Sequence, residues 1–183
     1  MKIAIRLVLI MALMSACVIK PMAPSDFPYD LMIQSSDLPR GFVRTGGSFP
    51  QIEGAFSHIV GYLSNPDKIA TGISHQITIY PSVDLAISSF PKWENEWLTN
   101  AWSEPSETYI PSDTSDAYVL KCMDIQIETT VSQSCTYLQQ HNNLVILVLA
   151  NIDSKAIDFR QFIEMLQKLD SRLPSEIVPM PGQ

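Results

Sequence analysis

The sequence predicts an α+β fold in which an antiparallel β-sheet packs against two or more helices, in a single domain with one disulfide bond. Three observations predict this class. Alternating apolar and polar residues mark strands before residue 80 and after residue 117, and apolar residues at helical spacing mark two further segments. Strands with antiparallel neighbours, mixed with helices that must bury one face, are typical of a layer of helices on a sheet.

The first strands are expected at residues 55–63 and 73–80, because side chains there alternate between two faces. Residues 31–42 precede them and contain Pro39 and Gly41, which favour a turn. We therefore expect a short helix entering a turn before the first strand.

A helix is expected from Ser82 onward, with Pro91 either kinking it or starting a second helix. Its apolar stripe comprises Val83, Ala86, Ile87, Phe90, Trp97, Leu98 and Ala101. Residues 103–115 are polar and broken by Pro105 and Pro111, so we expect a long surface loop there. Long loops in small domains are often functional.

Three more strands are expected at 117–127, 135–139 and 144–152, as an antiparallel meander with a turn at 141–143. Residues 144–149 are apolar on both faces, which predicts a central strand covered on both sides.

The last helix is expected to begin at a cap formed by Asp153 or Ser154 and to end at Pro174. Its apolar stripe comprises Ile157, Phe159, Phe162, Ile163, Leu166, Leu169 and Leu173.

Cys122 and Cys135 are expected to form the disulfide bond between neighbouring strands. The alternative is a metal site, which would need more thiol or imidazole ligands. Only His141 lies nearby in the sequence, and there is no Cys-x-x-Cys spacing. A structural disulfide is the favoured interpretation.

Composition limits the partners of the chain. Its 183 residues are 46% hydrophobic and 17% charged, which suits one folded domain. The formal net charge is −7, and loss of Lys2 and Arg6 with a signal peptide would lower it to about −9. Such a charge would repel the phosphates of nucleic acid, and no cluster of basic residues offsets it.

The N-terminus has the features of an export signal. Lys2 and Arg6 precede an apolar run at residues 7–14, which is shorter than the roughly 20 residues that a membrane-spanning helix needs. The run ends at Ser15, Ala16 and Cys17. Residues 13–17, Leu-Met-Ser-Ala-Cys, resemble the lipobox of bacterial lipoproteins, although the family usually has leucine where Met14 stands.

The resemblance to lipoproteins implies cleavage before Cys17, a diacylglycerol on its thiol and often a third acyl chain, such as palmitate, on its amine. Two or three chains hold a protein durably at a membrane. The expected organisation is a signal peptide at 1–16, lipidated Cys17 with a proline-rich tether at 17–28, a globular domain at 29–174 and a C-terminal tail at 175–183. The alternative is an ordinary signal peptide with an incidental thiol.

The expected location is therefore a cell membrane or outer membrane, with the domain lipid-anchored and facing outside the cytoplasm. Val18 follows the cysteine in place of the aspartate that retains many lipoproteins at the inner membrane, which implies outer-membrane delivery in two-membrane bacteria.

A looser resemblance concerns the domain itself. Leu38, Pro39, Gly41 and Phe42, followed by a strand, a helix, a disulfide-linked strand pair and a closing helix, are similar in layout to small exported sensor-like domains. These include extracellular domains of some bacterial serine/threonine kinases and stand-alone lipoproteins. The resemblance implies sensing of a ligand or partner and transfers no site residue.

Enzyme signatures are absent from the sequence. It has no Gly-x-Ser-x-Gly, phosphate-binding loop, dinucleotide fingerprint or His-Glu-x-x-His, so we predict neither catalytic residues nor a cofactor. His58, His75 and His141 could converge on a metal, but locally hydrogen-bonded histidines are the favoured interpretation.

The best candidate contact residues are Trp93, Trp102 and Tyr109, which lie near Trp97 and several glutamates and beside the 103–115 loop. Aromatic side chains there could form a platform for a sugar or peptide. The alternative is that Trp97 faces the core while Trp93 and Trp102 cover its edges.

The sequence thus predicts a lipid-anchored binding or sensing module for an unknown small ligand or envelope protein. The alternatives are a structural or assembly lipoprotein that acts through protein contacts and, as a distant third, a hydrolase.

Overall fold

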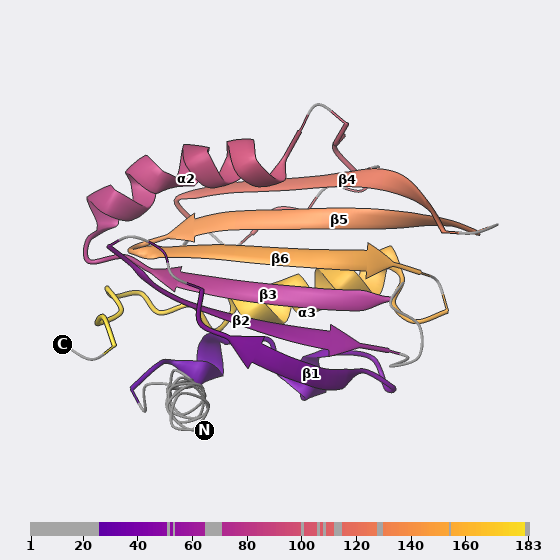
Figure 1. The fold of residues 1–183 in the computed structure, drawn as a ribbon, viewed down its shortest axis with the longest axis horizontal. Coiled ribbons are helices and arrows are strands. Elements are labelled where there is room, and N and C mark those ends of the chain that lie inside the picture. Colours follow the sequence, from indigo (N-terminus) through magenta and orange to yellow (C-terminus); the bar gives the residue numbers. More distant parts are fainter. Residues whose placement is uncertain are drawn as a thin grey trace, which may run out of the picture.

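A six-stranded antiparallel sheet forms the middle layer of the protein (Figure 1). The computed structural model describes residues 26–50, 52, 54–64, 71–99, 101–105, 107, 109–111, 115–127, 130–153 and 155–181. The strands are β1 (Val43–Ser48), β2 (Phe56–Leu63), β3 (Gly72–Ile79), β4 (Ala117–Ile127), β5 (Thr130–His141) and β6 (Leu144–Ile152). The helices are α2 (Val83–Trp97) and α3 (Phe159–Asp170), with two 3-10 turns, η1 (Tyr29–Leu31) and η2 (Ser35–Asp37). The predicted signal peptide, Cys17 and tether residues 17–25 lie outside the described residues.

The strands lie in the order β1-β2-β3-β6-β5-β4, and every neighbouring pair is antiparallel. Cys122 and Cys135 lie directly opposite each other on β4 and β5, with their Cα atoms 4.1 Å apart, and form a disulfide bond. The predicted α+β class, with its sheet, helices and disulfide, is therefore confirmed.

The central strands also agree with the sequence. β6 pairs with β3 on one side and β5 on the other, and most of its side chains are buried. β5 is longer than the predicted strand 135–139, and β1 was not predicted. β1 has two glycines among six exposed residues, so it carries no alternation from which a strand could be inferred.

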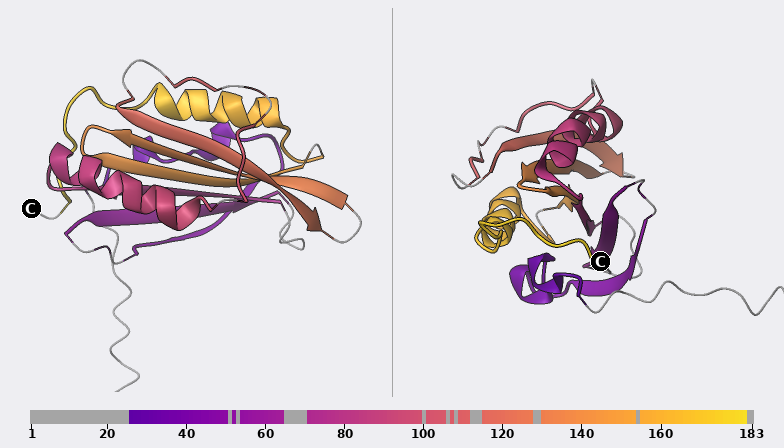
Figure 2. Two further views of the ribbon diagram at one scale, coloured as in Figure 1. Left: turned by 90° about the horizontal axis from the view of Figure 1, so that it is seen from above. Right: turned by 90° about the vertical axis from the view of Figure 1, so that its left-hand side faces the viewer.

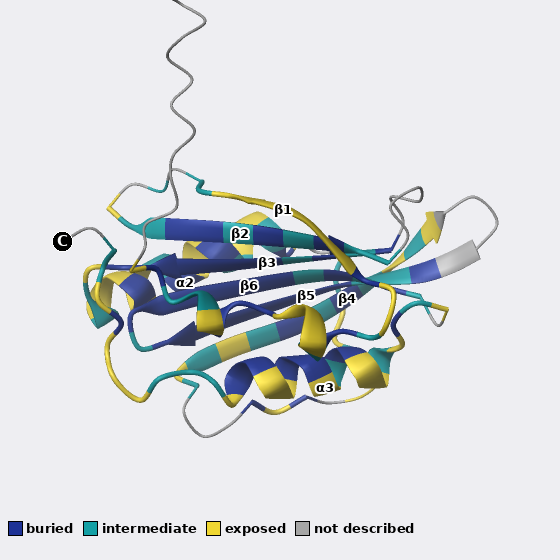
Figure 3. Cartoon of the chain, turned by 90° about the horizontal axis from the view of Figure 1, so that it is seen from below, coloured by how far each residue is buried: buried dark blue, intermediate teal, exposed yellow. Residues whose placement is uncertain are grey.

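The two long helices lie on opposite faces of the sheet (Figure 2). α2 packs against β5 and β6 through a small core that contains Ala86, Phe90, Trp93, Leu138 and Leu147. α3 covers the other face, where the larger core contains Phe162, Met165, Leu166 and Leu169. Figure 3 shows buried and exposed stripes on α3 and the exposed strand β1 at the sheet edge.

α2 begins at Ser82, whose hydroxyl accepts a hydrogen bond from the amide of Leu85 at 3.3 Å. Pro91 lies inside α2, which continues to Trp97, so no second helix begins at the proline. Trp93 is buried and Trp97 is only half-buried. The interpretation that Trp97 faces the core while Trp93 covers its edge is therefore wrong, because Trp93 is the ring in the core.

The start of α3 corrects a second expectation. Its cap is Asp158, not Asp153 or Ser154, and the Asp158 carboxylate accepts from the amide of Gln161 at 2.8 Å. The Gln161 side chain accepts in return from the amide of Asp158 at 3.0 Å. Ile157 is buried but precedes the helix, held by a bridge to Asp153. Reciprocal capping of this kind satisfies two amides that the first helical turn leaves free.

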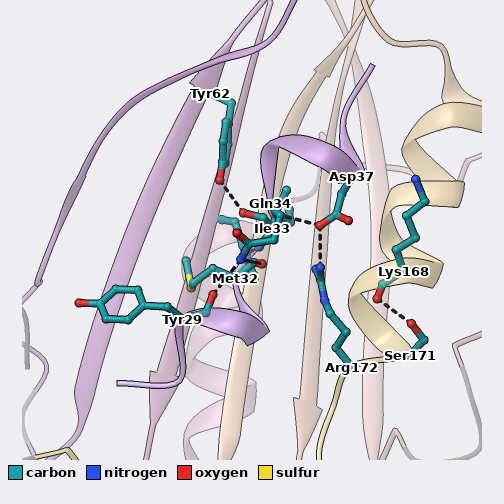
Figure 4. Close-up of polar contacts among 10 residues, drawn as sticks. Tyr29, Met32, Ile33, Gln34, Asp37, Tyr62, Lys168, Ser171 and Arg172 are labelled. Carbon is teal, nitrogen blue, oxygen red and sulfur yellow. Dashed lines mark hydrogen bonds and ion pairs between the residues drawn. The ribbon is translucent and has the colours of Figure 1, made fainter. Parts of the chain in front are cut away.

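Residues 27–38, which contain η1 and η2 and which we call the N-terminal strap, cross the β2–β3 half of the α3 face. The amide of Ile33 donates to Nδ1 of His75 at 2.9 Å, and its carbonyl accepts from the Tyr62 hydroxyl at 2.5 Å. Arg172, just after α3, forms a 2.8 Å ion pair with Asp37 (Figure 4). The strap and α3 therefore share one face of the sheet and together cover its core.

The segment after Pro174 also contacts the domain. Asn143, in the turn between β5 and β6, accepts from the amide of Val178 at 2.9 Å and donates to its carbonyl at 2.8 Å. Val178 is buried in the larger core, and Phe27, which precedes residue 29, is buried in the same core. The core therefore includes residues on both sides of the range 29–174.

Candidate functional site

Two adjoining hollows lie on the α2 face of the sheet, over the half that α2 leaves uncovered. The first has a volume of about 700 Å³ and lies between α2, β2, β3 and the segment after β1. The second has a volume of about 410 Å³ and lies over β2, β3, β5 and β6. Trp97 lines both hollows. We call the two together the α2-side groove.

The floor of the first hollow is a small polar network. Gln76 on β3 is buried, and its amide nitrogen donates to the hydroxyl of Ser57 at 2.8 Å. That hydroxyl lies 2.9 Å from the hydroxyl of Thr78. Because Gln76 also lines the hollow, its side chain brings an amide group to the floor in a fixed orientation.

Small side chains form the floor of the second hollow. Gly61 on β2 lies directly opposite Ser74 on β3, and Thr45 on β1 lines the same space. A Cβ atom at Gly61 would lie 2.9 Å from the Thr45 hydroxyl oxygen, so glycine keeps this floor low. Ser134 and Asn151, which pair across β5 and β6, complete the polar part of the lining.

The two tryptophans of α2 differ in how they are held. The indole nitrogen of Trp93 donates to the Tyr80 hydroxyl at 2.9 Å, which fixes this ring in the small core. The indole nitrogen of Trp97 is shielded from solvent and has no partner among the described residues. The two rings therefore differ in whether a described side chain fixes the indole nitrogen.

Trp102 reaches the groove from the segment that follows α2. Ser103 forms two backbone hydrogen bonds with Cys122 on β4, at 2.9 and 2.8 Å, so the segment extends the sheet at its β4 edge. Trp102 then lines the second hollow beside Trp97. The disulfide bond anchors the same point of β4 to β5.

Tyr109 lies elsewhere. It is buried in the larger core, with its ring 5.5 Å from that of Tyr137, and lines a separate hollow of about 400 Å³ at the β4 edge. Burial, followed by the nearby Asp170 carboxylate, raises its pKa. Of the three predicted contact residues, Trp93 lines the first hollow, Trp102 the second and Tyr109 neither.

Charge is unevenly distributed among the three hollows. Lys92 and Glu96 give the first hollow one charge of each sign, and the described lining of the second has no charged side chain. The Tyr109 hollow is acidic, because Glu94, Glu104 and Glu107 accompany a single lysine, Lys121.

The three histidines have separate local partners. His75 accepts from the strap amide of Ile33, and burial, followed by the nearby charges of Arg172 and His58, lowers its pKa to about 3. Nδ1 of His58 lies 3.1 Å from the Ser48 carbonyl, and burial also lowers the pKa of His58. Nε2 of His141 lies 2.5 Å from the Pro174 carbonyl.

Within the described ranges, no group of three or more His, Cys, Asp or Glu side chains is arranged to hold a metal ion. The helices in the same ranges are all too short or too polar to cross a membrane. No family model matches the chain, and no curated protein or solved structure is similar to it.

Sequence reasoning named two tryptophans of the groove but missed its floor. Gln76, Ser74 and Gly61 alternate with the apolar core residues of β2 and β3, and this alternation was the available signal. Polar residues on the second face of a strand usually face solvent. Here α2, the segment after β1 and Trp102 enclose them in part.

Proposed function

We propose that this protein is a lipid-anchored, extracytoplasmic binding module whose ligand occupies the α2-side groove. The groove carries the proposal, because it combines aromatic walls with a few polar groups on a rigid floor. Ligand sites are typically concave, largely preformed and lined by apolar groups with a few placed polar ones.

The position of the groove supports the same function. Its floor belongs to β2, β3 and β6 in the middle of the sheet, where backbone hydrogen bonds on both sides hold each strand. Its wall belongs to α2, which a capped N-terminus and the small core hold in place. A ligand would lose little affinity to ordering of such a site.

The anchor is supported by the lipobox-like residues that end at Cys17, next to small residues and an apolar run. We expect protein purified from membranes to have lost residues 1–16 and to carry two or three acyl chains by intact mass. Cys17→Ala should lose both the added mass and the membrane association. A soluble wild-type protein with an unmodified thiol would contradict the anchor.

Binding at the groove can be tested without knowing the ligand. Envelope material of the producing bacterium would be separated into neutral glycan, peptide and lipid fractions and added to purified protein. At least one fraction should raise the melting temperature of the wild type more than that of Ser74→Leu, whose longer side chain would protrude into the second hollow. Equal effects of every fraction on both proteins would contradict a binding function for the groove.

A further inference from the structure

We propose that the α2-side groove binds an uncharged oligosaccharide, with sugar rings seated against Trp97 and Trp102 over the low floor at Gly61 and Ser74. This inference rests on the proposed binding function and adds the chemical class of the ligand.

The second hollow combines aromatic residues with a low floor. Gly61 and Ser74 are small and lie opposite each other on neighbouring strands, while Trp97 and Trp102 line the same space. A flat apolar wall over a low floor admits a ring-shaped ligand. The faces of a sugar ring carry C–H groups that pack on an indole, and its edge carries hydroxyls that reach polar atoms.

The polar groups in the lining are mostly uncharged. Ser74, Asn151 and Ser134 offer hydroxyl and amide groups that both donate and accept, and Gln76 adds a further amide in the first hollow. The second hollow has no charged residue in its described lining, and Lys92 and Glu96 balance in the first. An ionic ligand would find no counter-charge in the second hollow, whereas ligand hydroxyls would find partners of either kind.

The backbone of the groove floor is already paired within the sheet. An extended peptide usually binds by adding a strand to a sheet edge, where unpaired amides and carbonyls are available. The floor of the groove comes from β2, β3 and β6, which are paired on both sides along this stretch. Recognition by the floor therefore relies on side chains, which suits a sugar better than a peptide backbone.

Together the two hollows suit a ligand of more than one ring. Each hollow falls within the range of about 300–1,000 Å³ that is typical of small-ligand sites, and the two meet at Trp97. A ligand of repeated rings could occupy both hollows with Trp97 between them.

The test uses the full mature chain with cellohexaose, maltohexaose, N-acetylchitohexaose and a printed array of neutral glycans. At least one should bind, with an affinity by calorimetry that changes little between low and high salt, because no charge pair forms. Trp97→Ala and Ser74→Leu should each weaken binding by about tenfold or more. Tyr118→Ala is the matched control, because Tyr118 is an exposed aromatic residue outside the groove, and its affinity should equal that of the wild type.

Circular dichroism and the melting temperature of each variant separate loss of binding from loss of folding. If no neutral glycan binds while the peptide or lipid fraction stabilises the wild type more than Ser74→Leu, the oligosaccharide assignment is overturned and the binding function stands. If a glycan binds equally well to Trp97→Ala, Ser74→Leu and the wild type, the groove is not its site and the assignment also fails. If no fraction and no glycan distinguishes the variants, both proposals fail.

Discussion

His75 shows how one side chain can set the acid stability of the domain. Its Nδ1 accepts from the Ile33 amide, so the imidazole is neutral and its proton lies on Nε2. Protonation of Nδ1 would break the contact between the strap and β3 and would place a charge in the core near Arg172. The low pKa of about 3 follows from that burial.

We predict that stability falls between about pH 6.5 and pH 3 because of His75. In that window the unfolded chain binds a proton that the folded chain excludes, so acid favours unfolding. For one such group, the free energy of unfolding falls by up to about 1.4 kcal/mol for each pH unit of acidification in this window. Urea unfolding of wild type and His75→Asn at several pH values measures it, and the variant should show a shallower slope. Parallel slopes would contradict the assignment.

The tryptophans show the limit of sequence reasoning at a single residue. Trp93 follows Phe90 by three positions and Trp97 follows it by seven, so both fit the same helical stripe. Trp93 lies over the hydrophobic pair Leu138 and Leu147, whereas Trp97 lies at the last turn of α2 beside small residues. Strand pairing decides which ring is buried, and the helical spacing does not contain that information.

At the level of elements, capping decides where α3 begins. Asp153 and Ser154 suit a cap in sequence, and Ile157 continues the apolar stripe. The bridge between Asp153 and Ile157 encloses Lys155 and Ala156 in a turn, and the Asp158–Gln161 pair places the cap four or five residues after the predicted one. Local competition between hydrogen bonds of this kind is not visible in the spacing of apolar residues.

We predict that Asp158→Ala lowers the free energy of unfolding by about 1 kcal/mol, the usual effect of losing a side-chain cap. Ser82→Ala at the start of α2 is the matched control, because the cap bond of Ser82 is longer, at 3.3 Å. This variant should lower the free energy of unfolding by less than Asp158→Ala does. Chemical denaturation of both variants gives the comparison. An unaffected Asp158→Ala protein would show that packing alone holds the first turn of α3.

At the level of the whole molecule, the fold class was predictable, because alternation and helical spacing mark most elements and the cysteine pair indicated a strand-to-strand disulfide. The groove was not predictable, because it depends on the pairing of β3 with β6 and on which half of the sheet α2 covers. Those are long-range relations that no local pattern records.

We predict that replacing both Cys122 and Cys135 with alanine lowers the free energy of unfolding by about 3 kcal/mol, because the cross-link restricts the conformations of the unfolded chain. Reduction of the wild type should have a similar effect, and reductant should leave the double variant unchanged. Equal stabilities of wild type and double variant would contradict a stabilising role for the bond.

We also predict that deleting residues 175–183 destabilises the domain by about 1–3 kcal/mol, because buried Asn143 loses both of its bonds to Val178. Deleting only residues 181–183 keeps Val178 and serves as the control. Thermal unfolding of the three chains measures the effect, and a stable 1–174 chain would show that water replaces the lost partner.

Thr45 lies at an irregularity in the ladder, because Arg44 pairs with Tyr62 and Gly46 pairs with Gly61. This β-bulge places one extra residue on an edge strand that is otherwise fully exposed. A flat, straight edge strand is a template on which further chains can add and aggregate. Because a bulge bends the strand, β1 is a poorer template than a straight edge strand would be, and the residue that interrupts the ladder is the one that lines the groove.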